Sequence, residues 1–506
     1  MAATSVGAGI LISRLAGLVR VALFAKYLGQ QTDAADAFNA AFRIPNLLQN
    51  LFGEGALSAA FIPIHAGLRA RGEHEAAAHA ARTFFALLTL VVAVLVLVGM
   101  VAAPWIIPVL APGFTGAKRE LTIRIVRILF PGAGLLVASA WCLSVLNSHG
   151  KFLLSYTAPV AWNVAMIACL QTFGGTHDLD RLAIYLAWAS VLGSFLQFAV
   201  QAPFAFGLSR HERRMSLSDP VRQAIRNFFP VLVSRGAVQL TGYIDAMIAS
   251  LLPTGAVTAI TNAQLIYLLP VSLFGVSISA AELPRMSGDA ASETGYAALR
   301  ARMDTGLKRL AFFVIPSAVA FATLGDVIAG ALLQRGRFTP RDSLYVWGIL
   351  AGSSIGLLAT TMARLYSVAH YAIGDPRRPL RFAIVRLVIV TILGYIAAVL
   401  LPPRLGIAAE WGAAGLTASA GVAGWIEFLL LRASLNGRVG STGLQASYAA
   451  RLWSAGVFAA AVAWAVKLAL PQVDPLIRGA IVLPVFGSAF LACAVLFGVR
   501  IQGLRR

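Results

Sequence analysis

Charged side chains occur inside stretches of this chain that are otherwise apolar enough to cross a membrane. The first stretch carries Arg14 and Arg20, and the second carries Asp36, Arg43 and Glu54. An ionised side chain at the centre of a spanning helix costs about 2.5–3.5 kcal/mol on insertion scales. Such groups are kept where they face a wet cavity or an opposite charge. We therefore expect a polar site inside the membrane-spanning part.

Arginine in such a site indicates binding of an anion, because its planar fork donates two parallel hydrogen bonds and stays charged. Arg14 and Arg20 on one helix would stand about 9 Å apart along the axis and roughly 120° apart around it. Both could line a broad cavity and bind an anionic head group. The alternative is an internal ion pair with Asp36, Glu54 or Asp245, or a position at the membrane interface.

The segment around Pro45 brings several polar groups together. Pro45 should break or bend the second helix, because it removes one helical hydrogen bond. Asp36 and Glu54 flank this segment. They are candidates for a gate, or for charge pairing within a kinked helix. Arg43 and Asn46 are further candidate substrate contacts.

Asp245 lies in the middle of a later apolar stretch. A carboxylate there could bind a cation or a proton and couple transport to a gradient, or it could neutralise Arg14 or Arg235. The sequence leaves both alternatives open. Neither a metal site nor a catalytic constellation is indicated, since the cysteines lie in apolar runs and the histidines lack ligand spacing. The sequence therefore does not favour an enzyme.

The composition is that of an all-α integral membrane protein. The chain has 506 residues, of which 58% are hydrophobic and 12% charged. Apolar runs of about 20 residues, enough to cross ~30 Å of hydrocarbon, recur along its whole length. They predict about fourteen spanning helices, at 2–28, 34–65, 79–111, 121–147, 153–174, 181–207, 224–252, 256–284, 305–333, 343–372, 380–402, 407–431, 450–470 and 476–499.

The formal net charge of +20 would suggest nucleic acid in a soluble protein. Here the basic residues gather at the helix ends of one side. The positive-inside rule then places both termini in the cytoplasm, with anionic membrane lipids as the contacts of these ends. No nucleic-acid partner is expected.

Weak echoes at a nearly constant spacing indicate an internal duplication. Ser-Arg at 13–14 recurs at 234–235, and Phe-Thr at 114–115 recurs at 338–339. Arg235 would be the equivalent of Arg14 and is a third candidate for head-group binding. Lobes of six helices insert in the same sense, which predicts a pseudo-two-fold axis along the membrane normal and a site between the lobes. The predicted domains are 1–208, 221–434 and a C-terminal pair of helices at 446–506.

Several segments resemble the MurJ (MviN-type) lipid II flippase family of the multidrug/oligosaccharidyl-lipid/polysaccharide exporter superfamily. They are Ser-Arg-Leu-Ala-Gly-Leu-Val-Arg at 13–20, Asp-Ala-Phe-Asn-Ala-Ala-Phe-Arg-Ile-Pro-Asn-Leu-Leu at 36–48, Gly-Glu-Gly-Ala-Leu-Ser-Ala-Ala-Phe-Ile-Pro at 53–63 and Tyr-Ala-Ile-Gly-Asp-Pro-Arg-Arg-Pro at 371–379.

The resemblance implies a flippase of the bacterial inner membrane for peptidoglycan biosynthesis. It implies two lobes around a central cavity, a groove for the lipid tail on the last two helices, and translocation of undecaprenyl-pyrophosphate-linked lipid II by alternating access. It matches Arg14, Arg20, Asp36 and Glu54 to cavity and gate residues. It also matches Asp245 to a position linked to sodium in some members. No bound cofactor is implied; Na⁺, H⁺ or the membrane potential are the candidate driving forces.

The chain departs from the family at three positions. Gln49, Asn50 and Leu265 stand where the family commonly has arginine. Fewer cations would weaken a pyrophosphate clamp. Two alternatives therefore stay open: a divergent exporter of another polyprenyl-linked glycan, and a non-transporting membrane scaffold with cell-wall synthesis proteins as partners.

Overall fold

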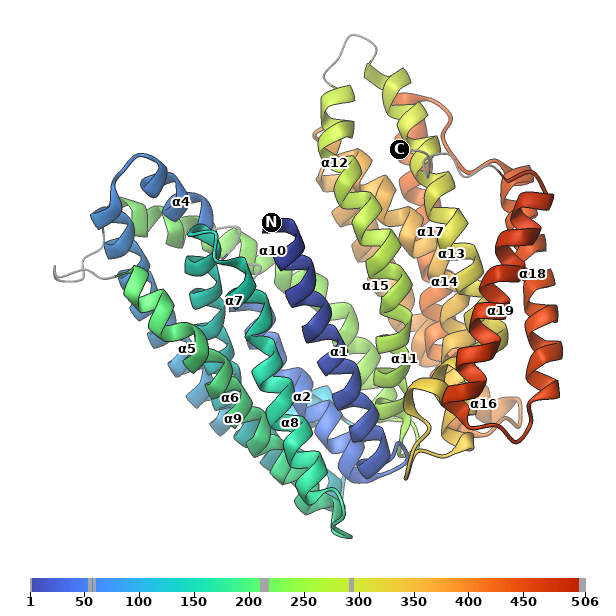
Figure 1. Ribbon diagram of the computed structural model, residues 1–506, viewed down its shortest axis with the longest axis horizontal. Coiled ribbons are helices and arrows are strands. Elements are labelled where there is room, and N and C mark those ends of the chain that lie inside the picture. Colours follow the sequence, from blue (N-terminus) through green and yellow to red (C-terminus); the bar gives the residue numbers. More distant parts are fainter. Residues whose placement is uncertain (1, 53–56, 58–60, 210–217, 291–294, 500–506) are drawn as a thin grey trace. The chain divides into compact units, whose positions relative to one another are not determined.

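The computed structural model describes residues 2–52, 57, 61–209, 218–290 and 295–499, without the side chains of 2–10, 229–231, 233–241 and 290. Every regular element in these ranges is a helix, which confirms the all-α prediction (Figure 1). Inter-residue contacts divide the chain into unit 1, residues 1–250 with 335–337, and unit 2, residues 251–334 with 338–506.

Unit 1 is built from the helices that carry most of the predicted site. Its helices are α1 (Ala2–Leu28), α2 (Asp33–Phe52), α4 (Ile62–Ala70), α5 (His74–Leu110), α6 (Gly116–Ser148), α7 (Phe152–Thr157), α8 (Pro159–Phe173), α9 (Leu179–Leu208) and α10 (Asp219–Ser250).

Unit 2 contains the remaining helices. They are α11 (Ala256–Pro270), α12 (Ser277–Ala290), α13 (Gly295–Leu333), α14 (Pro340–Ala372), α15 (Arg377–Tyr395), α16 (Leu401–Arg404), the 3-10 turn η3 (Ala409–Trp411), α17 (Gly412–Val439), α18 (Ala446–Ala469) and α19 (Pro475–Leu496). The π-helical turn η1 (Val271–Val276) joins α11 to α12, and the π-helical turn η2 (Ile396–Leu400) joins α15 to α16.

Eleven helical segments of the described chain are long and apolar enough to cross a membrane. Of the other predicted spans, 2–28 and 224–252 correspond to α1 and α10, whereas 34–65 covers α2, which ends at Phe52, and the start of α4. The count of fourteen spanning helices stays a prediction.

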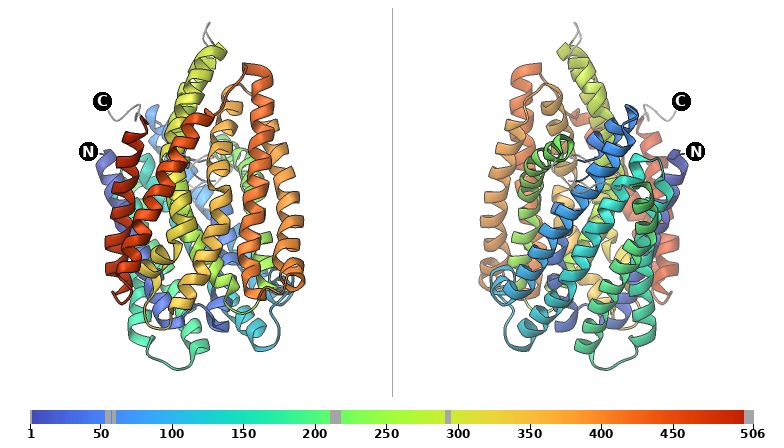
Figure 2. Two further views of the ribbon diagram at one scale, coloured as in Figure 1. Left: turned by 90° about the vertical axis from the view of Figure 1, so that its right-hand side faces the viewer. Right: turned by 90° about the vertical axis from the view of Figure 1, so that its left-hand side faces the viewer.

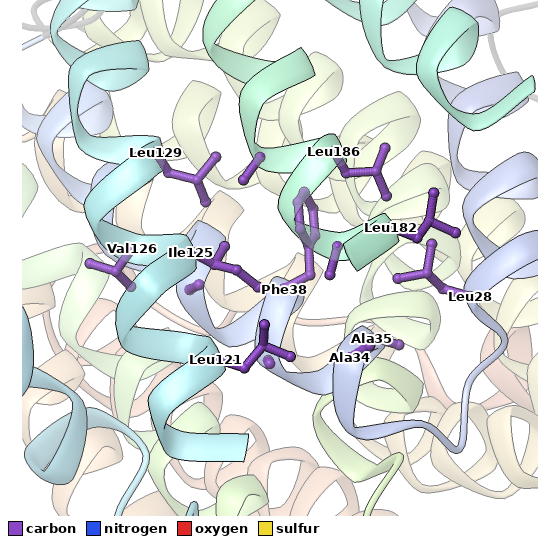
Figure 3. Close-up of a cluster of buried hydrophobic side chains, with 14 of the residues drawn as sticks. Leu28, Ala34, Ala35, Phe38, Leu121, Ile125, Val126, Leu129, Leu182 and Leu186 are labelled. Atoms are coloured by element: carbon purple, nitrogen blue, oxygen red, sulfur yellow. The ribbon is translucent and has the colours of Figure 1, made fainter. Parts of the chain in front are cut away.

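A buried apolar cluster fixes α2 against α6 and α9. Phe38 of α2 lies between Ile125 of α6 and Leu182 of α9 (Figure 3). Ala37 and Ala41 of α2 are fully buried, and their small side chains let the helix backbones approach closely. This packing sets the position of every polar group on α2. Helix α2 also continues through Pro45 without a break, so of the two predicted effects of this proline only a bend stays open; its buried face holds the helix together across the missing hydrogen bond.

The C-terminal ends of α6 and α14 repeat one another, in agreement with the predicted internal duplication. Phe-Thr precedes both helices, and both are 33 residues long. At their C-termini Gly150 (φ 72°) and Gly374 (φ 75°) adopt the left-handed conformation that glycine favours. The N–H of Lys151 donates to the Leu146 carbonyl and that of Asp375 to the His370 carbonyl, each at 2.9 Å. The two helices thus end in the same Schellman motif.

Helix α10 belongs to unit 1, whereas the sequence places the lobe boundary between 208 and 221. Phe228 at its start packs on Phe52 of α2 and Phe84 of α5, with ring centroids 5.8 and 6.0 Å apart. At its end Ser250 accepts a hydrogen bond from the Gly113 N–H at 3.2 Å. These contacts at both ends of α10 attach it to unit 1.

The C-terminal helices α18 and α19 pack on each other and on α13 (Figure 2). Helix α13 bends at Leu324, whose φ of −124° is not helical. The Trp464 indole N–H donates to the Thr323 carbonyl at 2.8 Å, next to an ion pair of Lys467 with Asp326 at 2.7 Å. These contacts attach α18 to the bend.

Candidate substrate-binding site

Arg20 of α1 is held in a defined orientation by two residues of α8. Its Nε donates to Asn163 Oδ1 at 3.1 Å, and its guanidinium carbon lies 4.8 Å from the centre of the Trp162 ring. Because Nε makes the internal bond, the terminal pair of nitrogens keeps the geometry that matches a phosphate. The cation–π contact adds stabilisation to the charge in a desolvated setting.

The partners of Arg20 are themselves fixed. Asn163 is 6% exposed and its Nδ2 donates to the Pro159 carbonyl at 3.1 Å. The Trp162 indole N–H donates to Ser190 Oγ of α9, also at 3.1 Å. The α8 surface under Arg20 is therefore pre-organised, which reduces the ordering cost of binding an anion.

Arg43 joins α2 to α10. Its Nη1 donates to the Gly242 carbonyl at 3.1 Å, and the Tyr243 hydroxyl donates to the Arg43 carbonyl at 2.8 Å. The Asp245 carboxylate interacts electrostatically with the same guanidinium. The neighbouring Phe42 ring lies 5.8 Å from Trp162. An aromatic contact thus connects the Arg43 group with the Arg20 group inside unit 1.

Asp36 is buried and charge-paired. It is 1% exposed, and its Oδ2 lies 2.9 Å from Lys118 Nζ of α6. The same ammonium lies 3.1 Å from Asp33 Oδ1 and 4.4 Å from the centre of the Phe114 ring. Of the two roles predicted for Asp36, this contact is charge pairing.

The other predicted residues are placed as follows. Arg14 is exposed on α1, and Asn46 is partly buried on α2. Glu54 and the side chain of Arg235 lie outside the described residues. Leu265, where the family commonly has arginine, is 37% exposed on α11 of unit 2. The structure brings Arg20 and the Arg43–Asp245 pair together through aromatic contacts, and it places Asp36 with Lys118.

Sequence reasoning missed Asn163, Trp162 and Lys118. An asparagine beside a tryptophan within an apolar stretch was the available signal for the first two. Unit 2 also contains an ion pair that the sequence did not predict, between Arg386 of α15 and Glu427 of α17 at 3.0 Å. A partly buried pair of this kind joins neighbouring helices.

Comparison with known proteins decides the family. The family model described as "Lipid II flippase MurJ" matches residues 24–477. The chain belongs to the MurJ family. The lipid II flippase MurJ of Burkholderia cenocepacia is 32% identical over 85% of this chain and 82% of that protein. The probable lipid II flippase MurJ of Vibrio cholerae is 30% identical over 99% of this chain and 96% of that protein.

Solved structures show the same fold. A structure described as lipid II flippase MurJ in an inward closed conformation matches with a TM-score of 0.77 and 21% identity, covering 97% of this chain and 98% of that one. A multidrug resistance MATE family transporter of the MOP superfamily matches with a TM-score of 0.67 and 17% identity, covering 86% of this chain and 98% of that one. The chain is therefore a multi-pass membrane protein with the transporter fold that MurJ proteins share with MATE proteins.

Proposed function

We propose that this protein flips undecaprenyl-pyrophosphate-linked lipid II from the inner to the outer leaflet by alternating access. The observation that carries the proposal is Arg20, an arginine in a membrane-spanning unit whose fork is oriented by Asn163 and Trp162. Membership of the MurJ family and the names of the relatives support the substrate. No catalytic step is assigned to the chain.

The physical difficulty of flipping is the desolvation of the pyrophosphate. A guanidinium oriented before the ligand arrives compensates for lost water without further reorganisation. Arg20 would bind the pyrophosphate, with Arg14 and Arg43 as further cations, while the polyprenyl tail stays in lipid. Asn163 acts as a positioning residue, because it holds Arg20 without using the terminal nitrogens.

The test is flipping by purified protein in vesicles, together with rescue of bacteria depleted of their own lipid II flippase. Arg20→Ala should lower the flipping rate roughly 10- to 100-fold, since a charged hydrogen bond contributes about 1.5–3 kcal/mol. Arg20→Lys should recover only part of the rate. The matched control is Arg181→Ala, which removes an exposed arginine paired with Asp178 at the start of α9. Flipping by Arg20→Ala at the native rate would refute the proposal, and so would partner binding without any flipping by the native protein, as in a scaffold.

The second candidate function is export of another polyprenyl-linked glycan. It is favoured by Leu265, Gln49 and Asn50, where the family commonly has arginine. Rescue of a lipid II flippase depletion, without rescue of strains that lack exporters of other polyprenyl-linked glycans, would decide for lipid II.

We further propose that the membrane potential drives the cycle and that Asp245 serves as the counter-charge of Arg43. The electrostatic contact between the two side chains supports this role. A potential acts directly on an empty cationic site. Flipping should then respond to an imposed potential in sodium-free buffer at equal pH on both sides. A strict requirement for Na⁺ that Asp245→Asn abolishes would instead make Asp245 a coupling site.

For the cellular setting we propose the bacterial inner membrane, with both termini in the cytoplasm. The proposal follows from the positive-inside rule, because the basic residues gather on the side of the 148–152 and 373–379 loops. The proposed partners are the lipid-linked precursor, membrane lipids and proteins of cell-wall synthesis.

A further inference from the structure

Unit 1 has a lateral pocket that the flipping site does not use. It has a volume of about 550 Å³ and lies where α5, α6 and α9 meet. Its lining is partly apolar and partly charged: Met100, Glu120, Ile123, Arg124, Arg127, Ile128, Pro131 and Trp188. Helix α6 packs against both α5 and α9 within unit 1 (Figure 1). We propose that the pocket binds the head group of an amine-bearing phospholipid, such as phosphatidylethanolamine.

The pocket opens onto a surface that must meet lipid. Helix α5 exposes a row of large apolar side chains beside it, including Leu97, Val98 and Val101, each more than half exposed. Trp105 of α5 and Trp188 of α9 are 69% and 58% exposed. Exposed tryptophans are typical of the membrane–water interface. Trp188 lines the pocket itself, and Met100 lies one to two turns from Trp105, about 7 Å along α5, so the pocket is close to this interface.

Arg127 is fixed in the pocket by the sequence of α5. Pro104 has no N–H, so the carbonyl four residues before it, that of Met100, loses its helical donor. Arg127 Nε donates to this carbonyl at 3.1 Å. Close packing brings the two helices together here, because a Cβ on Gly99 would lie 2.2 Å from the Phe130 ring. As with Arg20, this bond uses Nε, so the two terminal nitrogens of the guanidinium can bind a phosphate.

Arg124 has no such structural role among the described contacts. It is exposed one turn before Arg127 on the same face of α6. Within the described part of the chain, neither of these arginines forms an ion pair with a carboxylate. A charge at this depth is expensive unless an anion accompanies it. Two guanidinium groups three residues apart on one helix can both bind the oxygens of a phosphodiester.

Glu120 indicates which class of phospholipid head group the pocket binds. It lines the same pocket one helical turn from Arg124, about 6 Å toward the start of α6. In a phospholipid the head-group amine lies outside the phosphate, toward water. The order Glu120, Arg124, Arg127 therefore matches an ammonium followed by a phosphate. A purely anionic head group would leave the carboxylate facing a negative charge.

The test is lipid retention by the full-length protein, measured by native mass spectrometry after delipidation and titration with phosphatidylethanolamine or phosphatidylglycerol. The native protein should retain phosphatidylethanolamine in preference. Arg124→Gln should lower this retention about tenfold, the effect of losing one charged contact. Arg119→Gln, an exposed arginine of the same helix outside the pocket, should leave it unchanged. Glu120→Gln should remove the preference over phosphatidylglycerol.

Three results would overturn the proposal. The first is equal retention by Arg124→Gln and Arg119→Gln at the same unfolding temperature. The second is equal binding of both phospholipids by the native protein. The third is displacement of phosphatidylethanolamine by undecaprenyl diphosphate, which would assign the pocket to the transported lipid. Failure of flipping in the Arg20 experiment would leave these results unaffected, because lipid retention is measured without transport.

Discussion

At the scale of single residues, charges inside unit 1 are kept by partners from distant parts of the chain. Asp36 depends on Lys118, and Arg20 depends on Asn163 and Trp162. Removing one partner of a buried pair costs more than the pair contributes, because the remaining charge stays desolvated.

Lys118→Ala is expected to destabilise the protein by about 3–5 kcal/mol, the usual cost of leaving a buried charge without its partner. The Asp36 side chain is 2% exposed, whereas the Asp33 side chain is 58% exposed. The matched control Asp33→Asn should therefore cost only about 0–1 kcal/mol. Chemical denaturation in detergent measures both. The double variant Lys118→Met/Asp36→Leu should recover stability; a double variant no more stable than Lys118→Ala would show that packing, not charge, is responsible.

The arginines of the site could be found from the sequence, because a cation in an apolar stretch stands out by itself. The orientation of their side chains could not be predicted from the sequence. Asn163 is 143 residues from Arg20, and only the packing of α1 on α8 brings the two together. The same holds for Lys118, which the sequence shows simply as a basic residue at a helix start.

At the scale of elements, close helix packing in unit 2 depends on glycine. A Cβ on Gly356 of α14 would lie 2.3 Å from the Gly421 Cα of α17. Backbones in this contact touch without any side chain between them. Small residues at such crossings replace the hydrophobic driving force that lipid cannot provide.

Gly421→Ala should destabilise unit 2 by about 1–3 kcal/mol, because overpacking forces the helices apart. Its Cβ would lie 2.8 Å from the Gly356 nitrogen, an atom that cannot move without its helix. The control is Gly437→Ala on the same helix, where nothing lies within 4 Å. That change should be neutral or stabilise by up to about 1 kcal/mol. Thermal unfolding temperatures compare the two; a control that unfolds as early as Gly421→Ala would contradict the packing argument.

Helices could be predicted well because lipid requires every spanning backbone to be hydrogen-bonded internally. The duplication was visible in turn residues, and the matching ends of α6 and α14 agree with it. The packing partners of a helix could not be predicted from its local sequence. Helix α2 continues through Pro45 without a break, and α10 packs with unit 1 although its sequence aligns with the second repeat.

At the scale of the whole molecule, charge distribution predicts how the chain inserts. Lys151 lies in the loop after α6, and Arg377 and Arg378 lie after α14; both helices end in the same Schellman motif. Both should face the cytoplasm.

Single cysteines test this orientation in intact cells with a maleimide that does not cross membranes. His177→Cys, in the exposed turn before α9, should react from outside. Arg377→Cys, exposed at the start of α15, should react only after permeabilisation. The native cysteines are buried and give little background: Cys142, Cys169 and Cys493. The reverse labelling pattern would invert the proposed topology.

The bend of α13 has a consequence for how the protein is made. The Thr323 carbonyl at the bend accepts a hydrogen bond from Trp464, which is translated 141 residues later. Until that tryptophan has been synthesised, the bend lacks this hydrogen bond. A chain stopped shortly before residue 464 would therefore be a substrate for membrane quality-control proteases rather than a shortened transporter.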